Sequence, residues 1–492
     1  MKNMTQQRMG ALLKASILVL FFIPQAKLLA QPSTIWTETF GGSGNEYGHS
    51  FDKTSDDGYI IAGLTCSYGA GEEDVWLIKT DVSGNIQWDA TFGGSDSDYG
   101  YSVQQTDDDG YIITGFTESF SHGDSDRDVW LIKTDASGIL EWDKPLGGYN
   151  HDEGRSVQQT SDGGYIIVGF TSSFIADGMD VWLIKTDASG NYQWTCFCGG
   201  SASDAGLSVQ QTFDGGYIVA GYTNSYGAGS ADLWLIKTDA WGNIQWDNTF
   251  GGYDWDQARS VQQTSDGGYV MTGHTDSYCS GGTDVWLIKT DASGNMEWDR
   301  TFAGPYTDKG YSVEETFEGG YIIAGYTTSF GAGGADVWLI KTDPSGDMQW
   351  DITYGGSNWD QGHSVQQTSD GGYAIAGYTR SYGAGSADVW LIKTAPEVGI
   401  ESDEPDLCTS VECYPNPSTG LVTIDYRTQT GGRAVLSVYD LAGRRVASLV
   451  EGLCTPGQHT VLWNPVDVCS GVYLLKLETT ESQATTRLLL YR

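Results

Sequence analysis

Hydrophobic and polar residues along most of the chain alternate in short strands and tight turns, and this pattern repeats about every 52 residues. Each repeat contains four strand patterns, seen in different repeats at residues 260–264, 320–327, 284–290 and 243–250. The pattern at 284–290 is apolar at consecutive positions, so both faces of that strand are expected to be buried. The intervening segments are rich in Gly, Ser, Asp and Asn, which are typical of turns. The pattern predicts an all-β fold built from four-stranded sheets.

Two series of tryptophans count the repeats: Trp36, Trp88, Trp142, Trp194, Trp246, Trp298 and Trp350, and then Trp76, Trp130, Trp182, Trp234, Trp286, Trp338 and Trp390. Seven sheets that are buried on both faces must stack against one another, and a radial stack is a seven-bladed β-propeller, here over residues 31–394. The last repeat stops at Thr394 without a fourth strand, and residues 34–40 supply one. We therefore expect the N-terminal strand to complete the seventh blade and close the ring. An open solenoid, which needs atypical units at both ends, is the alternative.

One turn of the repeat carries a family likeness. The segment Asp-Ala-Ser-Gly-Asn-Tyr-Gln-Trp at 187–194 resembles the tryptophan-docking segment of quinoprotein-type propellers, which has a slightly longer turn. The resemblance implies the propeller fold, while the residues by which that family holds its quinone have no counterpart here. Likeness to WD-repeat propellers rests on architecture without the signature motifs.

The two ends of the chain differ in composition from the repeats. Residues 1–30 combine early basic residues, a short apolar run and a small residue at the end, which is the pattern of a secretory signal. Residues 395–406 hold two Pro and five acids and are predicted to be a linker. Residues 407–492 contain short strand patterns and equal numbers of acids and bases, which predicts a small immunoglobulin-like β-sandwich.

The C-terminal segment resembles the sorting domain of the type IX (Por) secretion system of Gram-negative bacteria. The matching pieces occur in family order at residues 414–417, 438–446, 470–477 and 487–492. The resemblance implies export by the type IX machinery, followed by release or attachment at the outer-membrane surface. Four cysteines in this segment are a departure from the family. The residues that carry the motif are Pro415, Asn416, Pro417, Tyr439, Gly443, Gly471 and Tyr473.

The chain is strongly acidic, with 64 Asp and Glu against 26 Lys and Arg and a net charge of −38. Such a chain repels phosphate, so no nucleic-acid partner is expected. No segment after residue 30 is apolar enough to span a bilayer, so no transmembrane segment is expected in the mature chain. Residues 31–394 carry a net charge of −37, because acids recur at turns and strand ends.

One recurrent acid falls in each connection between the fourth strand and the next first strand: Glu46, Asp98, Asp152, Asp204, Asp256, Asp308 and Asp360. Seven carboxylates around a channel mouth could hold a cation or a polar ligand. The alternative, which their identical use in every repeat favours, is a turn residue bonded to nearby backbone.

A ligand site should break the sevenfold pattern, because one ligand meets unlike groups in one place. His49 and His363 share one slot in the first and last repeats, where Arg155 and Arg259 stand in other repeats. Trp255 and Trp359 precede Asp256 and Asp360, and aromatic rings beside carboxylates suit sugars. Packing within the loops is the alternative. The candidate ligand-binding residues are Trp255, Asp256, Trp359, Asp360, His49 and His363.

Metal and disulfide chemistry have weaker support. Asp124, Asp126 and Asp128 alternate in the one repeat with a two-residue insertion and could bind calcium, but the glycine and distal Glu of a helix-flanked calcium loop are missing. No other cofactor is predicted. Cys408, Cys413, Cys454 and Cys469 could form disulfides in three pairings after export, with a metal site as the weaker alternative.

Scans for catalytic motifs find none of the common metalloprotease, phosphate-loop, nucleophile-elbow or dinucleotide signatures. The sequence therefore favours a non-enzymatic, exported propeller that binds an extracellular glycan or protein. An extracellular polysaccharide hydrolase or lyase with acids on the channel face is the alternative. A quinone-dependent dehydrogenase rests on the turn resemblance alone.

Overall fold

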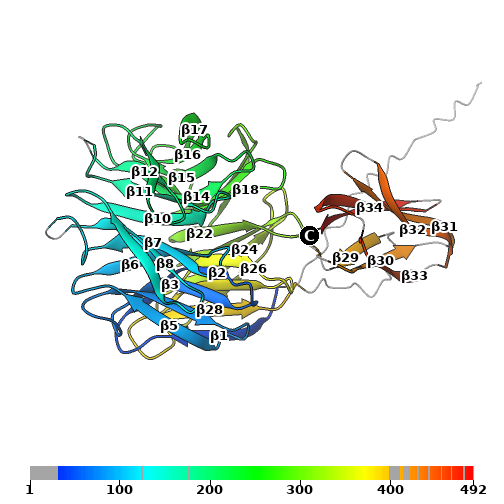
Figure 1. Cartoon of the computed structure of the whole chain (residues 1–492), viewed down its shortest axis with the longest axis horizontal. Coiled ribbons are helices and arrows are strands. Elements are labelled where there is room, and N and C mark those ends of the chain that lie inside the picture. The colour runs from blue at the N-terminus through cyan, green and yellow to red at the C-terminus, as the bar shows by residue number, and fades with distance from the viewer. Residues whose placement is uncertain are drawn as a thin grey trace, which may run out of the picture. The chain divides into compact units, whose positions relative to one another are not determined.

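The computed structural model describes residues 31–123, 126–175, 178–397 and most of 410–490, and the chain divides into two compact units, Met1–Gly399 and Ile400–Arg492. The predicted signal at residues 1–30 and most of the predicted linker lie outside the described residues. Regular structure in the described residues is entirely β-strand (Figure 1).

The first unit contains seven four-stranded antiparallel sheets. The first three are β2 (Glu46–Lys53), β3 (Tyr59–Thr65), β4 (Asp74–Thr80) and β5 (Ile86–Phe92); β6 (Asp98–Gln105), β7 (Tyr111–Thr117), β8 (Asp128–Thr134) and β9 (Leu140–Leu146); β10 (Asp152–Gln159), β11 (Tyr165–Thr171), β12 (Asp180–Thr186) and β13 (Tyr192–Cys198). The next three are β14 (Asp204–Gln211), β15 (Tyr217–Thr223), β16 (Asp232–Thr238) and β17 (Ile244–Phe250); β18 (Asp256–Gln263), β19 (Tyr269–Thr275), β20 (Asp284–Thr290) and β21 (Met296–Phe302); β22 (Asp308–Glu315), β23 (Tyr321–Thr327), β24 (Asp336–Thr342) and β25 (Met348–Tyr354).

The seventh sheet joins the two ends of the unit. It consists of β26 (Asp360–Gln367), β27 (Tyr373–Thr379), β28 (Asp388–Thr394) and, at its outer edge, β1 (Thr34–Phe40). β1 pairs antiparallel with β28, with Thr37 opposite Ile392, and Figure 1 shows the dark-blue β1 beside the end of the propeller chain. The N-terminal strand therefore supplies the fourth strand that the last repeat lacks, as the sequence predicts.

The first strands of the seven sheets contact one another in chain order, and β26 in turn contacts β2. A cycle of hydrogen bonds accompanies these contacts: the side-chain oxygen of each first strand's Gln, Asp or Glu accepts a backbone N–H of the next first strand. Gln104 Oε1 accepts the N–H of Gln159 at 2.6 Å, and Gln366 Oε1 accepts that of Lys53 at 3.1 Å. The first strands thus surround the axis of the unit.

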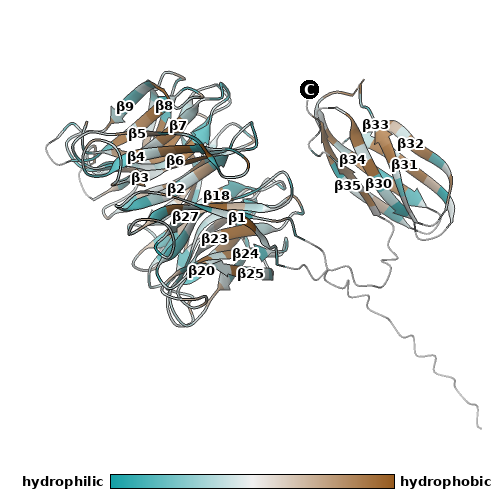
Figure 2. Ribbon diagram, turned by 90° about the horizontal axis from the view of Figure 1, so that it is seen from below, coloured by the Kyte–Doolittle hydropathy of each residue, from teal (hydrophilic) through white to brown (hydrophobic). Residues whose placement is uncertain are grey.

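The core lies between neighbouring sheets. One cluster joins Leu77 of β4 with Tyr111 of β7 and Trp130 of β8, all almost fully buried. Every residue of β4 and of its counterparts in the other sheets is buried, in agreement with their continuous apolar sequence. Figure 2 shows the hydrophobic residues concentrated along the strands, for example β23 and β24. Burial on both faces of the strands is the main stabilising contribution.

Each outer strand docks a tryptophan on the next sheet. Trp36 lies against the turn that joins β4 to β5, where a Cβ atom at Gly84 would come within 2.8 Å of the indole. Gly84 has φ +83°, a conformation that favours glycine. Asp81 fixes the turn by accepting the N–H groups of Ser83 and Asn85, each at 2.9 Å. The repeated Asp-x-Ser-Gly-Asn…Trp motif is therefore a docking device between sheets.

The second unit is a β-sandwich. One sheet contains β29 (Ser410–Tyr414), β30 (Val422–Thr428) and β33 (Gly457–Trp463), and the other contains β31 (Gly432–Asp440), β32 (Arg445–Cys454), β34 (Gly471–Thr479) and β35 (Gln483–Leu490). Ile424, Leu436 and Leu475 are fully buried in its core. Among the described side chains of β29, Val411 is the buried one, so the sequence gives this strand only a weak hydrophobic pattern.

Candidate functional site

The seven recurrent acids do not lie in connecting loops, as the sequence indicated, but at the first residue of each inner strand, and their side chains are fully buried. Asp256 Oδ2 accepts the Gly252 N–H at 2.8 Å and the Ser277 hydroxyl at 2.6 Å. Asp360 has the equivalent bonds to Gly356 and Ser381. Asp256 and Asp360 therefore hold turns, and neither carboxylate can accept ligand hydroxyls while these bonds persist.

Each of these buried acids has an acidic neighbour from the preceding sheet. A Cβ atom at Gly93 would lie 1.9 Å from Asp74 Oδ1 and 2.8 Å from Asp98 Oδ2, so both carboxylates face the same glycine. Burial, and then the charge of Asp204, raise the pKa of Asp180 to about 6. The neighbouring acids are Glu46 with Asp388, Asp74 with Asp98, Asp128 with Asp152, Asp180 with Asp204, Asp232 with Asp256, Asp284 with Asp308, and Asp336 with Asp360.

The recurrent lysine at the other end of the third strand is buried in all seven sheets and forms an ion pair in six of them. Lys237 Nζ lies 2.9 Å from Asp214 and donates to the Thr238 carbonyl at 2.8 Å. Burial would raise the pKa of Asp214, but the Thr212 hydroxyl and Lys237 hold it at about 2. The partner is the Asp of the turn between the first and second strands, as Asp214 is for Lys237. The side chains that recur from sheet to sheet, such as Lys237, Asp214 and Asp256, are called the frame of the propeller. The recurrent charges among them stabilise it.

Seven half-buried side chains around the axis differ from sheet to sheet. They occupy the bulge of each first strand, one residue before the recurrent Ser, and we call them the axial ring. Adjacent members contact one another: the His49 and His363 rings stack with centroids 5.4 Å apart, and Tyr311 lies edge-on to His363 at 5.0 Å. The axial ring consists of His49, Tyr101, Arg155, Leu207, Arg259, Tyr311 and His363.

The two ring histidines are held in the neutral form. Their Nδ1 atoms are 3.3 Å apart, so at most one of the two atoms carries a proton. Burial, followed by the charge of Arg259, lowers the pKa of His363 to about 4. Burial, followed by the charges of His363 and Arg155, lowers the pKa of His49. At neutral pH the pair therefore offers hydrogen-bonding groups and an aromatic surface without positive charge.

The two ring arginines differ in their partners. Arg155 forms an ion pair with Glu153 and stacks on Tyr101 with its guanidinium carbon 4.1 Å from the ring centre. Arg259 makes no hydrogen bond or ion pair with any residue that the structure describes, and its guanidinium carbon lies 5.5 Å from the centre of Tyr311. Burial lowers the pKa of Arg259. The axial ring thus contains a half-buried cation without an acidic partner.

Two further basic groups lie beside Arg259. The pKa of Lys309 is lowered by burial and by the charge of Arg259. His274, 3% exposed, has its pKa lowered to about 2 by burial and by the charges of Lys309 and Arg259. A local excess of basic groups inside a protein of net charge −38 is the clearest electrostatic anomaly of the propeller.

The candidate tryptophans connect to the axial ring through tyrosines. Trp359, 45% exposed, lies 6.2 Å from Tyr326, whose ring is 5.8 Å from Tyr311. Trp255, 37% exposed, lies 5.4 Å from Tyr222. Burial raises the pKa of Tyr222, and the charges of both ring arginines partly offset this. The structure therefore brings His49 and His363 together and links Trp359 to them, whereas Trp255 reaches the arginine side.

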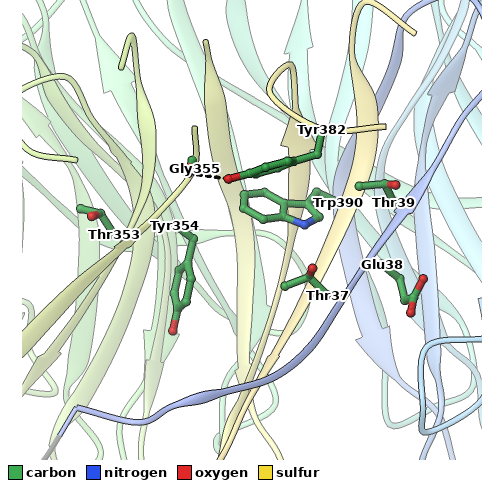
Figure 3. Close-up of a pocket in the computed structure, with 8 residues that line it drawn as sticks. All are labelled: Thr37, Glu38, Thr39, Thr353, Tyr354, Gly355, Tyr382 and Trp390. Atoms are coloured by element: carbon green, nitrogen blue, oxygen red, sulfur yellow. Dashed lines mark hydrogen bonds between the residues drawn. The ribbon is translucent and has the colours of Figure 1, made fainter. Parts of the chain in front are cut away.

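A separate cavity of about 490 Å³ opens between the sixth and seventh sheets, lined by β1, β25 and neighbouring residues (Figure 3). Thr37 stands there where five of the other six outer strands have an Asp that accepts the tryptophan N–H, as Asp351 does from Trp338 at 2.8 Å. Tyr382 donates to the Gly355 carbonyl at 2.8 Å across the cavity. Glu38 is its only ionisable lining group apart from two tyrosines, so the cavity offers little to fix a ligand.

The calcium candidates are only partly described, because Asp124 lies outside the described residues. Asp126 accepts the Arg127 N–H at 2.8 Å, and Asp128 accepts the His122 N–H at 2.9 Å and contacts the His122 ring. No group of three or more His, Cys, Asp or Glu side chains among the described residues has the arrangement of a metal site. Calcium binding stays a prediction.

The sorting motif joins the first part of the second unit to its last strand. Asn416 donates to the Arg487 carbonyl and accepts the Leu489 N–H, each at 2.8 Å, which ties it to β35. Tyr473 donates to the Cys469 carbonyl at 2.8 Å, and Tyr439 and Gly471 lie at the ends of paired strands. Cys454 and Cys469 carry free thiols. Pro415, Pro417, Gly443 and Cys408 lie outside the described residues.

Comparisons with known proteins give one family match, at the C-terminal end, and several distant likenesses. Residues 412–491 match the family described as secretion system C-terminal sorting domain. Regulatory protein FlaEY of Caulobacter vibrioides is 25% identical over 173 residues, which make up 33% of this chain and only 16% of that protein. Sqt1 from Chaetomium thermophilum has a TM-score of 0.42 at 11% identity, covering 71% of this chain and 82% of that one. The Neurospora crassa Pan2 WD40 domain has a TM-score of 0.43 at 10% identity, covering 74% of this chain and 100% of that one.

The chain therefore combines a β-propeller with a C-terminal type IX sorting domain, and the protein is secreted or attached to the outer membrane of a Gram-negative bacterium. Its partner in export is the type IX secretion machinery. Within the described part of the chain, no helix has the length and hydrophobicity needed to cross a bilayer.

Proposed function

We propose that the protein is a non-catalytic binding module that holds an extracellular glycan at the axial ring of its propeller. The observation that carries this proposal is the axial ring itself, in which unlike polar and aromatic side chains occupy equivalent positions of the seven first strands. Exposed tryptophans and half-buried tyrosines supply flat apolar faces, on which sugar rings stack.

The alternative function, a polysaccharide hydrolase or lyase, requires carboxylates free to act as acid and base. Asp256 and Asp360 are committed to turns, as described above. Glu153, two residues before Arg155 on the same first strand, pairs with both Arg155 and Arg127. Binding without turnover is therefore the function that these side chains support best.

The test uses the mature chain, residues 31–492, with a panel of galactose, cellobiose, galacturonate and digalacturonate. Isothermal titration measures binding, and chromatography of the same samples measures turnover. We expect at least one sugar to bind and to be recovered intact. Tyr311→Ala should weaken that binding at least tenfold, whereas the matched control Trp241→Ala, an exposed aromatic on an outer turn, should leave it unchanged. Cleavage that Tyr311→Ala abolishes would establish an enzyme instead.

A further inference from the structure

We propose that the axial ring binds the oxyanion of an acidic sugar, a carboxylate or sulfate group, between Arg155 and Arg259. This inference rests on the proposed glycan-binding function and names the class of ligand. Arginine presents several N–H donors in a planar fork that matches the oxygens of such a group.

The charge around Arg259 is unbalanced. Its buried Nε has no hydrogen-bond partner among the described residues. The groups that act on its charge are three tyrosines, Tyr311 most of all, which are neutral at pH 7, and the like charge of Arg155. Among the described residues, Lys309 on the neighbouring first strand makes no ion pair either, and Asp276 is the acid that offsets its charge. A guanidinium withdrawn from water without a counter-ion is costly. A bound anion would supply the missing partner.

The two arginines flank a single apolar position of the ring. Arg155 lies on β10 and Arg259 on β18, and Leu207 of β14 stands between them. Each charge is close enough to act on Tyr222, and the charge of Arg155 lowers the pKa of Arg259. The Nε atoms of both arginines are buried donors without partners. Two donors on either side of an apolar residue form a cradle for one oxyanion.

Aromatic side chains continue from this cradle towards solvent. Tyr222 connects Arg155 and Arg259 to the exposed Trp255, and Tyr311 and Tyr326 connect Arg259 to the exposed Trp359. A sugar ring that carries an acidic group could rest on these faces with the group directed at the arginines. Small inorganic anions lack the ring and should bind more weakly.

The test titrates the mature chain with galacturonate, galactose 6-sulfate and galactose. We expect one or both acidic sugars to bind at least tenfold more tightly than galactose. Arg259→Met should reduce their affinity to that of galactose, and Arg259→Lys should restore part of it. Arg300→Met, which removes an exposed arginine paired with Asp347, is the matched control and should change nothing. Circular dichroism checks folding, and Arg155→Met provides a second variant.

The outcomes separate the inference from the proposed function. Equal binding of all three sugars would leave glycan binding standing and would overturn the oxyanion site. Equal weakening by Arg259→Met and Arg300→Met would also overturn it, since a long-range charge effect would then explain the preference. No binding of any sugar in either panel would overturn both proposals. Tighter binding of galactose 6-sulfate than of galacturonate would identify sulfate as the oxyanion.

Discussion

The frame of the propeller and its axial ring follow opposite rules. In the frame, one set of polar groups recurs in nearly every sheet, and most members have a partner from the same or the next sheet, as Lys237 has Asp214. In the axial ring, seven equivalent positions hold four kinds of residue, and Arg259 has no acidic partner. Repetition within one chain therefore marks what every sheet needs to fold. Departure from it marks groups that the fold does not require.

The largest effect is expected where a frame contact is broken. Asp214→Ala leaves the buried ammonium of Lys237 without its carboxylate, which should lower the free energy of unfolding by about 3 kcal/mol. Urea unfolding followed by tryptophan fluorescence measures this loss, because 17 of the 18 tryptophans lie in the propeller. Asp254→Ala, which removes an exposed acid, is the matched control and should change stability by less than 0.5 kcal/mol. Equal effects of the two variants would contradict a structural role for the lysine pair.

The buried acid pairs predict a stability difference that depends on pH. The pKa of Asp180 is raised from 3.8 to about 6 in the folded protein, so the folded state binds more protons than the unfolded state between these values. The contribution of Asp180 to stability is therefore present at pH below about 4 and is lost as pH rises to about 6. Asp180→Asn removes the charge and should stabilise the protein at pH 7.5 by about 1 to 3 kcal/mol.

The same variant should lose its advantage in acid. We expect wild type and Asp180→Asn to unfold at the same urea concentration at pH 4, because Asp180 is then protonated in both the folded and, largely, the unfolded state. Comparing the two proteins at each pH cancels the titration of His49, His274 and His363, whose lowered pKa values destabilise the folded state in acid. A difference that is constant from pH 4 to 7.5 would refute the charge repulsion between Asp180 and Asp204.

In the axial ring, removing a polar group should have the opposite effect on stability. Arg259→Leu reproduces the residue that Leu207 supplies at the same position of another sheet. Because the guanidinium is withdrawn from water without an acidic partner, we expect this change to raise the free energy of unfolding by about 1 kcal/mol. Thermal unfolding of the mature chain without ligand measures the gain. A loss of stability comparable to that of Asp214→Ala would place Arg259 in the frame.

The sequence alone predicts the repeat, the sheet count and strands such as β20 at 284–290, because the apolar period and the turn residues are local signals. It places the recurrent acids wrongly in loops, because the polar start of each first strand resembles a turn. It does not identify the partner of the recurrent lysine, because Asp214 is 23 residues away from Lys237 in sequence. The contact between His49 and His363 joins residues 314 apart. These two residues meet only because the seventh sheet lies beside the first sheet. The sequence shows which residues depart from the repeat, but not which of them lie together.

The smallest predicted effect concerns the sixth sheet, in which the lysine pair of the frame departs from the repeat. Glu318 replaces the usual Asp, and Lys341 consequently has no carboxylate within ion-pair distance among the described residues. Thr316 donates to the Gly320 carbonyl instead of to an Asp, and burial lowers the pKa of Lys341.

Glu318→Asp should restore the bonds to Lys341 and Thr316 that are seen in the other sheets. We expect it to raise the free energy of unfolding by about 0.5 kcal/mol, since the new carboxylate is partly exposed. Urea unfolding at pH 7.5 measures the gain, and Glu315→Asp on the same sheet is the control without an expected gain. If Glu318→Asp leaves sugar binding unchanged while stabilising the protein, the frame and the axial ring are energetically separate. A change in sugar affinity would show instead that a departure within the frame also serves the ligand site.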